Sequence, residues 1–136
     1  MNVLQNIGPL VGRILIALIF IMAGWGKITG FEGTVGYIAS KGLPLPQVGA
    51  VIAIVLELSG GLMIATGYKA RWGAAALFVF VATTALFFHN FWAMPADQAQ
   101  NQMIHFMKNL AIMGGLLYVV VHGSGPLSVE RNTSRT

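Results

Sequence analysis

Four long apolar stretches dominate this sequence, and each has about the length that a helix needs to cross a membrane. They lie at about residues 10–29, 46–66, 71–92 and 103–122. A span needs roughly 20 residues, and its backbone must form its hydrogen bonds within the segment, as a helix does. Only 9% of the residues are charged, too few for the surface of a water-soluble globule. The sequence therefore predicts an all-α integral membrane four-helix bundle, a single domain over residues 1–136.

The segments between the spans predict how the helices are connected. Residues 30–45 contain aromatic side chains and the run Leu-Pro-Leu-Pro, which indicates a short amphipathic segment at the membrane interface. Residues 67–70 form so short a link that the second and third spans must be antiparallel neighbours. Residues 93–102 form a polar link, and residues 123–136 are predicted to be a loose tail. The first span has no basic leader and no A-x-A site, so we expect it to be retained.

The basic residues predict the orientation of the chain in the membrane. Five of the eight fall on the side that holds both termini: Arg13, Lys69, Arg71, Arg131 and Arg135. Positive residues favour the cytoplasmic side, so both termini are predicted to be cytoplasmic, with Arg13 and Arg71 contacting lipid headgroups. Because the basic residues are scattered rather than clustered, no nucleic-acid partner is expected.

Seven ionisable or amide side chains lie within the spans or near their ends. An ionisable group inside lipid costs roughly 2.5–3.5 kcal/mol, so it is a functional candidate by default. The seven are Lys27, Glu57, His89, Asn90, His105, Lys108 and Asn109. Six of them fall in the non-cytoplasmic half, with Glu57 near the middle of its span. If the helices form a bundle, we expect these side chains to converge in one polar pocket that opens outward.

The chemistry of these groups indicates candidate roles. Carboxylate, amine and imidazole groups exchange protons with a bound molecule, which makes Glu57, Lys108 and His89 the candidate catalytic residues. The candidate ligand-binding residues are Lys27, Asn90, His105 and Asn109.

Structural roles remain open for the same residues. Glu57 lies too deep to reach the headgroups, so it either pairs with Lys27 or Lys108 or is protonated. Such a pair is equally consistent with a lock between two helices. In the alternative interpretation Lys27 extends to the headgroups, and Asn109 only bonds a neighbouring helix.

Several kinds of metal and redox site are excluded or left without support. The chain has no cysteine, which excludes disulfides, iron–sulfur clusters, cysteine-bound zinc and thiol catalysis. His89 and His105 fall on different spans and have no carboxylate at metal-site spacing, so no metal centre is predicted. Haem ligation by this histidine pair stays open.

Several motifs along the chain resemble those of one family of small membrane proteins. The first span fits the pattern R…F-x-x-x-G-x-x-K and the second fits E-x-x-G-G…G…R. The residues that carry the match are Arg13, Phe20, Gly24, Lys27, Glu57, Gly60, Gly61, Gly67, Arg71, His89, Lys108, Asn109, Gly114, Gly115 and the glycine-rich ending at 123–128. With these residues the chain resembles the DoxX family over about residues 13–128. Relatives often carry an acidic residue directly after the last serine, where this chain has Val129.

The resemblance implies a bacterial inner-membrane location and a link to redox chemistry. Some relatives are described as subunits of a thiosulfate:quinone oxidoreductase, and others as parts of membrane oxidoreductase assemblies that handle oxidative stress. Together with the expected pocket, this favours a membrane subunit that binds a quinone. Without a cysteine or an evident cofactor site, such a subunit needs a bound quinone or a protein partner to pass electrons.

Two other functions fit the same residues. The chain is a non-catalytic scaffold or anchor for a partner protein if the polar cluster only locks the helices together. It is a small transporter if it dimerises, because four spans are little machinery for alternating access. The spacing of Gly8 and Gly12 matches the G-x-x-x-G motif of helix dimers, so a homo-oligomer is one candidate partner besides membrane lipid.

Overall fold

The computed structural model describes residues 2–130, and this part of the chain is helical without any strand. The helices are α1 (Val3–Thr29), α2 (Phe31–Ser40), α3 (Pro46–Thr66), α4 (Ala70–Phe88), the short 3-10 turn η1 (Phe91–Ala93) and α5 (Ala96–His122). Four of them, the third counted together with η1, are long and apolar enough to cross a membrane. The prediction of an all-α, four-span protein is therefore confirmed.

Helices α1 and α5 begin earlier than the apolar stretches suggest, at residues 3 and 96 instead of about 10 and 103. At the start of α1, the side chain of Asn2 accepts a hydrogen bond from the Gln5 N–H at 2.9 Å, and the Gln5 side chain accepts one from the Asn2 N–H at 3.1 Å. This reciprocal cap satisfies N–H groups that a helix start leaves free. Hydropathy indicates which residues lie in the hydrocarbon core, whereas capping residues determine where a helix begins.

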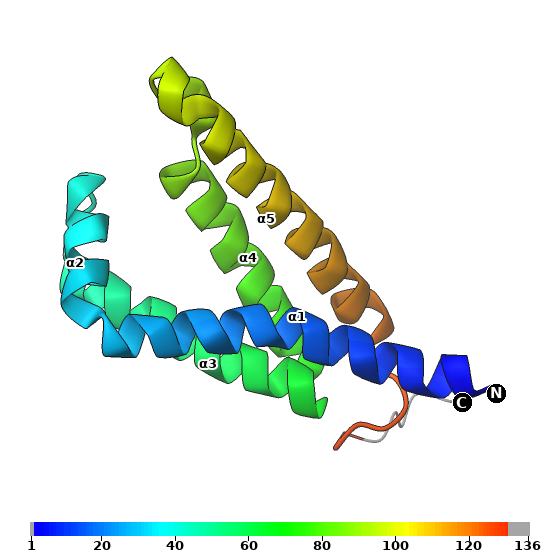
Figure 1. Cartoon of the computed structure of the whole chain (residues 1–136). Coiled ribbons are helices and arrows are strands. Elements are labelled where there is room, and N and C mark those ends of the chain that lie inside the picture. Colours follow the sequence, from blue (N-terminus) through cyan, green and yellow to red (C-terminus); the bar gives the residue numbers. More distant parts are fainter. Residues whose placement is uncertain (1, 131–136) are drawn as a thin grey trace.

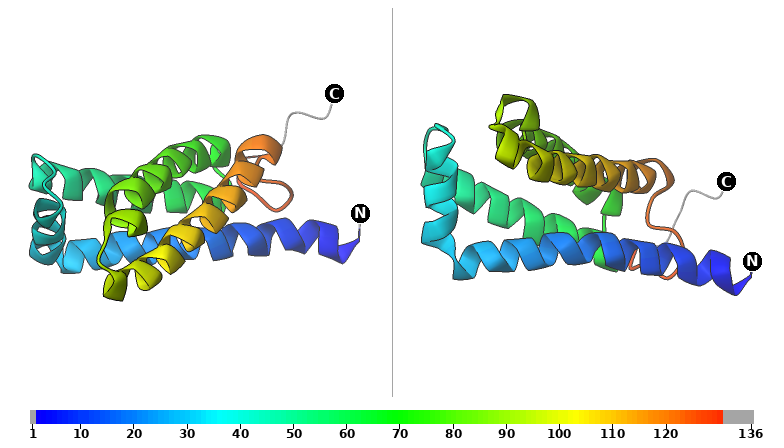
Figure 2. Two further views of the ribbon diagram at one scale, coloured as in Figure 1. Left: turned by 90° about the horizontal axis from the view of Figure 1, so that it is seen from above. Right: turned by 45° about the horizontal axis from the view of Figure 1, so that its top comes forward.

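The helices form two antiparallel pairs that meet at one end and diverge toward the other. Helices α1 and α3 make one pair and α4 and α5 make the other, so that the molecule has the shape of a V (Figure 1). Helix α2 lies across the ends of α1 and α3 at the open side of the V, and it extends toward the side where α4 lies (Figure 2). The segment at 30–45, expected to be a short amphipathic piece, is thus built around a helix of 10 residues.

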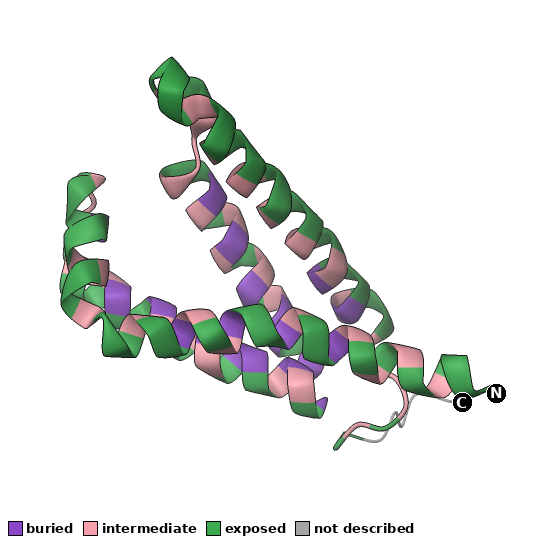
Figure 3. Cartoon of the chain, viewed as in Figure 1, coloured by how far each residue is buried: buried purple, intermediate pink, exposed green. Residues whose placement is uncertain are grey.

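The buried core lies toward the closed end of the V (Figure 3). Its members are Ala17, Phe20, Ile64, Ala70, Ala74, Leu77, Val81, Leu116 and Val119. Small residues bring the helices close enough to build it. A Cβ at Gly60 of α3 would lie 2.8 Å from two carbons of Leu77 on α4, closer than real Cβ atoms approach. Glycine is therefore required where α3 meets α4.

Arg13 does not contact headgroups as expected, because its side chain points into the protein and is only 3% exposed. One guanidinium nitrogen, Nη1, donates to the carbonyls of Ile64 and Ala65 at 3.4 Å each. The other, Nη2, donates to the carbonyls of Leu127 at 2.9 Å and Pro126 at 3.5 Å. The first two carbonyls belong to the last turn of α3, where helix carbonyls lack helical partners and favour a cation.

The first part of the C-terminal tail is folded rather than loose. The Val129 N–H donates to the Thr66 carbonyl at 2.9 Å, and the Lys69 N–H donates to Glu130 Oε2 at 2.7 Å. These bonds close the tail over the turn between α3 and α4. Residues 131–136, which include Arg131 and Arg135, lie outside the described residues.

Replacing Arg13 by lysine should destabilise the protein by about 2 kcal/mol, because a single ammonium cannot bridge the same four carbonyls and hydrogen bonds to charged groups contribute about 1.5–3 kcal/mol each. Thermal unfolding in detergent, followed by circular dichroism, measures the change. Arg71→Lys is the matched control, since Arg71 is exposed. Equal stability of the two variants would show that the carbonyl contacts of Arg13 do not matter.

Candidate functional site

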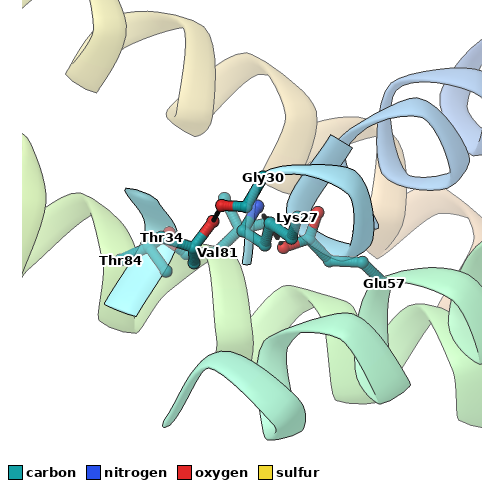
Figure 4. A network of polar contacts seen from close by, with 6 residues as sticks. All are labelled: Lys27, Gly30, Thr34, Glu57, Val81 and Thr84. Atoms are coloured by element: carbon teal, nitrogen blue, oxygen red, sulfur yellow. Dashed lines mark hydrogen bonds and ion pairs between the residues drawn. The ribbon is translucent and has the colours of Figure 1, made fainter. Parts of the chain in front are cut away.

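An ion pair joins α1 and α3 inside the membrane-spanning region. Lys27 Nζ lies 2.8 Å from Glu57 Oε1 (Figure 4). Glu57 is 2% exposed, whereas the Lys27 side chain is 29% exposed. Of the two cations expected as partners of this carboxylate, the structure selects Lys27.

Glycine at position 24 allows this pair to form. A Cβ at Gly24 would lie 2.7 Å from Leu58 Cγ and 3.4 Å from Glu57 Cβ. The missing side chain lets α1 lie directly against α3 at this level. Lys27 follows one turn later, in the last turn of α1, where the negative end of the helix dipole also favours a cation.

The ion pair forms part of the wall of a cavity of about 480 Å³. This volume is in the range of sites for small organic ligands. All five α-helices contribute to the lining, most of which is apolar. The polar side chains of the lining are Lys27, Thr34, Tyr37, Glu57, Thr83, Thr84, His89 and Asn109. The cavity lies toward the open part of the V, so groups from both helix pairs face it.

Within the cavity, several polar atoms keep free hydrogen-bonding capacity. Thr34 donates to the Gly30 carbonyl at 3.2 Å and Thr84 donates to the Val81 carbonyl at 3.0 Å (Figure 4). Each hydroxyl oxygen therefore still has lone pairs to accept a bond. Glu57 Oε1 is buried, and Lys27 Nζ lies 2.8 Å from it. A carboxylate oxygen has further lone pairs that a ligand donor could use.

His89 reaches the cavity from the end of α4. Its Nδ1 lies 2.8 Å from Gln102 Oε1. An amide oxygen only accepts hydrogen bonds, so with this orientation of the Gln102 amide Nδ1 carries a proton. Gln102 was not singled out from the sequence, because neutral amides near a helix start are common on protein surfaces.

The structure brings four of the seven candidate residues together in the cavity: Lys27, Glu57, His89 and Asn109. His105 stacks on His89 with ring centroids 5.3 Å apart but does not line the cavity. Asn90 is half-buried outside the lining, and Lys108 is exposed. Neighbouring residues on a helix point about 100° apart, so Lys108 and Asn109 do not both face inward.

The hydroxyl groups of the cavity are not marked in the sequence. Thr34, Tyr37, Thr83 and Thr84 line it, yet these residue types are ordinary in membrane helices and carry no charge that marks them as costly in lipid. Residues 2–130 contain no group of three or more histidine, aspartate or glutamate side chains placed to hold a metal ion.

Fold and cavity together define a small multi-pass membrane protein with an internal, mainly apolar cavity. Residues 8–90 match the model of the DoxX family. The chain is 42% identical over 134 residues to inner membrane protein YqjF of Escherichia coli K12, covering 96% of this chain and 95% of that protein. It is 41% identical over 123 residues to inner membrane protein YphA of the same strain, covering 90% and 87%. No solved structure matches the chain.

This protein therefore belongs to the DoxX family and is a multi-pass protein of the bacterial inner membrane. Its similarity also extends to a protein of Bacillus subtilis (strain 168) whose name is Putative oxidoreductase CatD. That match is 35% identical over 71 residues and covers 52% of each chain.

Replacing Lys27 by methionine should lower the free energy of unfolding by about 3 kcal/mol, because it leaves the buried Glu57 carboxylate without its cation. Adding Glu57→Gln should recover most of this loss, since the charge is then absent too. Thermal unfolding of the two single variants and the double variant measures the coupling. A double variant that is no more stable than Lys27→Met would show that the pairing of charges is not the cause.

Proposed function

We propose that this protein is the quinone-binding membrane subunit of an oxidoreductase. The observation that carries the proposal is the buried Lys27–Glu57 pair in the wall of a mainly apolar cavity. A quinone has an apolar ring with carbonyl oxygens, and such a site offers apolar contact together with a few convergent polar groups. The oxidoreductase name of CatD supports the same class of chemistry.

The polar groups have complementary tasks in this proposal. Lys27 Nζ donates a hydrogen bond to a quinone carbonyl, and Glu57 accepts one from a hydroxyl of the quinol. Reduction of a quinone to a quinol takes up two electrons and two protons. Glu57 and His89 exchange the protons with the ligand. The electrons come from a partner redox protein, because the chain has no cysteine for a thiol or iron–sulfur relay.

Decylubiquinone should bind the purified protein saturably in detergent, as measured by equilibrium dialysis. Glu57→Gln should weaken this binding about tenfold, a loss of roughly 1.4 kcal/mol, because glutamine keeps the shape but not the charge. Ala23→Phe should abolish it by filling the cavity, since Ala23 lines the wall. Lys108→Ala, an exposed site outside the lining, should leave it unchanged.

Thermal unfolding of each variant separates a loss of binding from a loss of folding. The proposal is refuted if binding to the wild type does not saturate. It is also refuted if Glu57→Gln and Ala23→Phe both bind decylubiquinone as tightly as the wild type. If folded variants with an altered ion pair also kept the activity of a co-purified partner, the ion pair would only hold α1 and α3 together, and the protein would be a scaffold.

Both termini are cytoplasmic in this proposal, which places the cavity in the periplasmic half. The absence of native cysteine allows single cysteines to report the side. A cysteine in place of Glu32 or Asp97, both exposed at the end away from the termini, should react with an impermeant maleimide in spheroplasts. A cysteine in place of Lys69 should react only after lysis, and the reverse pattern would invert the orientation.

A further inference from the structure

We infer that the cavity opens sideways into the lipid, between α1 and α5, so that its ligand has a polar head and an apolar tail that stays in the bilayer. The inference rests on the proposed function for the identity of the head group. It concerns the route of access and the shape of the ligand, and both depend on which walls of the cavity are closed.

Aromatic and apolar contacts close the end of the cavity that faces the membrane surface. Helix α2 runs across this end (Figures 1 and 2). Its Tyr37 ring lies 5.2 Å from the Phe88 ring of α4, and both residues line the cavity. Ile38 of α2, only 8% exposed, packs against α3 beside Gly49. A route from water would have to pass Tyr37, which is itself 47% exposed, and displace its contact with Phe88.

The sides of the cavity reach the surface that faces lipid, and on α3 the lining residue Ile52 is 52% exposed. The wall between α1 and α5 is the side where the two helix pairs diverge. Ile19 of α1 lines the cavity and is nevertheless 49% exposed. It lies near the middle of α1, at the depth of the hydrocarbon core. From α5, the half-buried Asn109 and Ile112 line the same space. The two helices belong to the diverging pairs (Figure 1), and they come close at few positions, one of which is Ile16 beside Gly115.

Position and chemistry then determine how a ligand lies. Ile19 precedes Lys27 by eight residues, or about 12 Å along the helix. A head group held by Lys27 and Glu57 can therefore extend its apolar tail past Ile19 into the lipid. A tail in this position stays among apolar side chains and lipid, whereas a tail pointing toward α2 would meet Tyr37 and Phe88.

Spin-label accessibility in lipid nanodiscs tests the opening without any quinone. A single nitroxide at Ala23→Cys reports on the cavity, because Ala23 lines it and the chain has no other cysteine. Collisions with oxygen, which dissolves in lipid, are compared with collisions with a water-soluble nickel chelate. Labels at Leu18→Cys, exposed at the depth of the lipid core, and Ser40→Cys, exposed at the end of α2, are the two references.

An Ala23 label at least fivefold more accessible to oxygen than to the chelate, as at Leu18, supports the lateral opening. A label that resembles the one at Ser40 overturns it.

The binding assay is a second, independent test of the opening. Decylubiquinone should bind at least tenfold more tightly than the tailless ring, and Ile19→Trp should remove that advantage while Ile14→Trp, exposed outside the lining, should not. If neither quinone binds but the label reports lipid, the proposed function fails and the lateral opening stands.

Discussion

A carboxylate near the middle of a lipid-embedded helix is the constraint on which the rest of the structure depends. Glu57 is almost fully buried, and a charge in this position needs a partner or has to be neutralised. Lys27 supplies the partner at 2.8 Å, but only because Gly24 lets α1 lie against α3. The ion pair, the glycine and the pairing of the two helices are therefore a single unit.

The division of the bundle into two pairs explains why a cavity exists. Core side chains such as Ile64, Leu77 and Leu116 are completely buried where the pairs meet, and Arg13 ties α3 to the folded tail at the same end. Toward the other end the pairs diverge, and α2 bridges part of the space (Figure 1). The polar groups in that space come from both pairs, so both pairs form the wall of the cavity.

The similarity to relatives supports the fold and the location, whereas the contacts in the cavity bear on the function. YqjF and YphA align with nearly the whole chain, which supports the fold and the location. Neither name states a chemistry, so the function has to be argued from the cavity. There the charged pair sits on one helix pair, while His89 and Asn109 approach from the other. This arrangement gives a ligand two chemically different faces.

The sequence by itself determined the class of protein, the four spans and the list of costly polar residues, because lipid allows a long apolar segment hardly any fold except a helix. It also named Lys27 and Lys108 as candidate partners of Glu57, with protonation of the carboxyl as the alternative. Only the tertiary structure decided between them, turned Arg13 inward, folded residues 123–130 and placed Asn109 but not Lys108 in the cavity. These outcomes depend on how each helix is rotated and how the pairs cross. Rotation and crossing are set by side-chain packing between distant segments, such as Gly60 against Leu77, and hydropathy along the chain does not encode them.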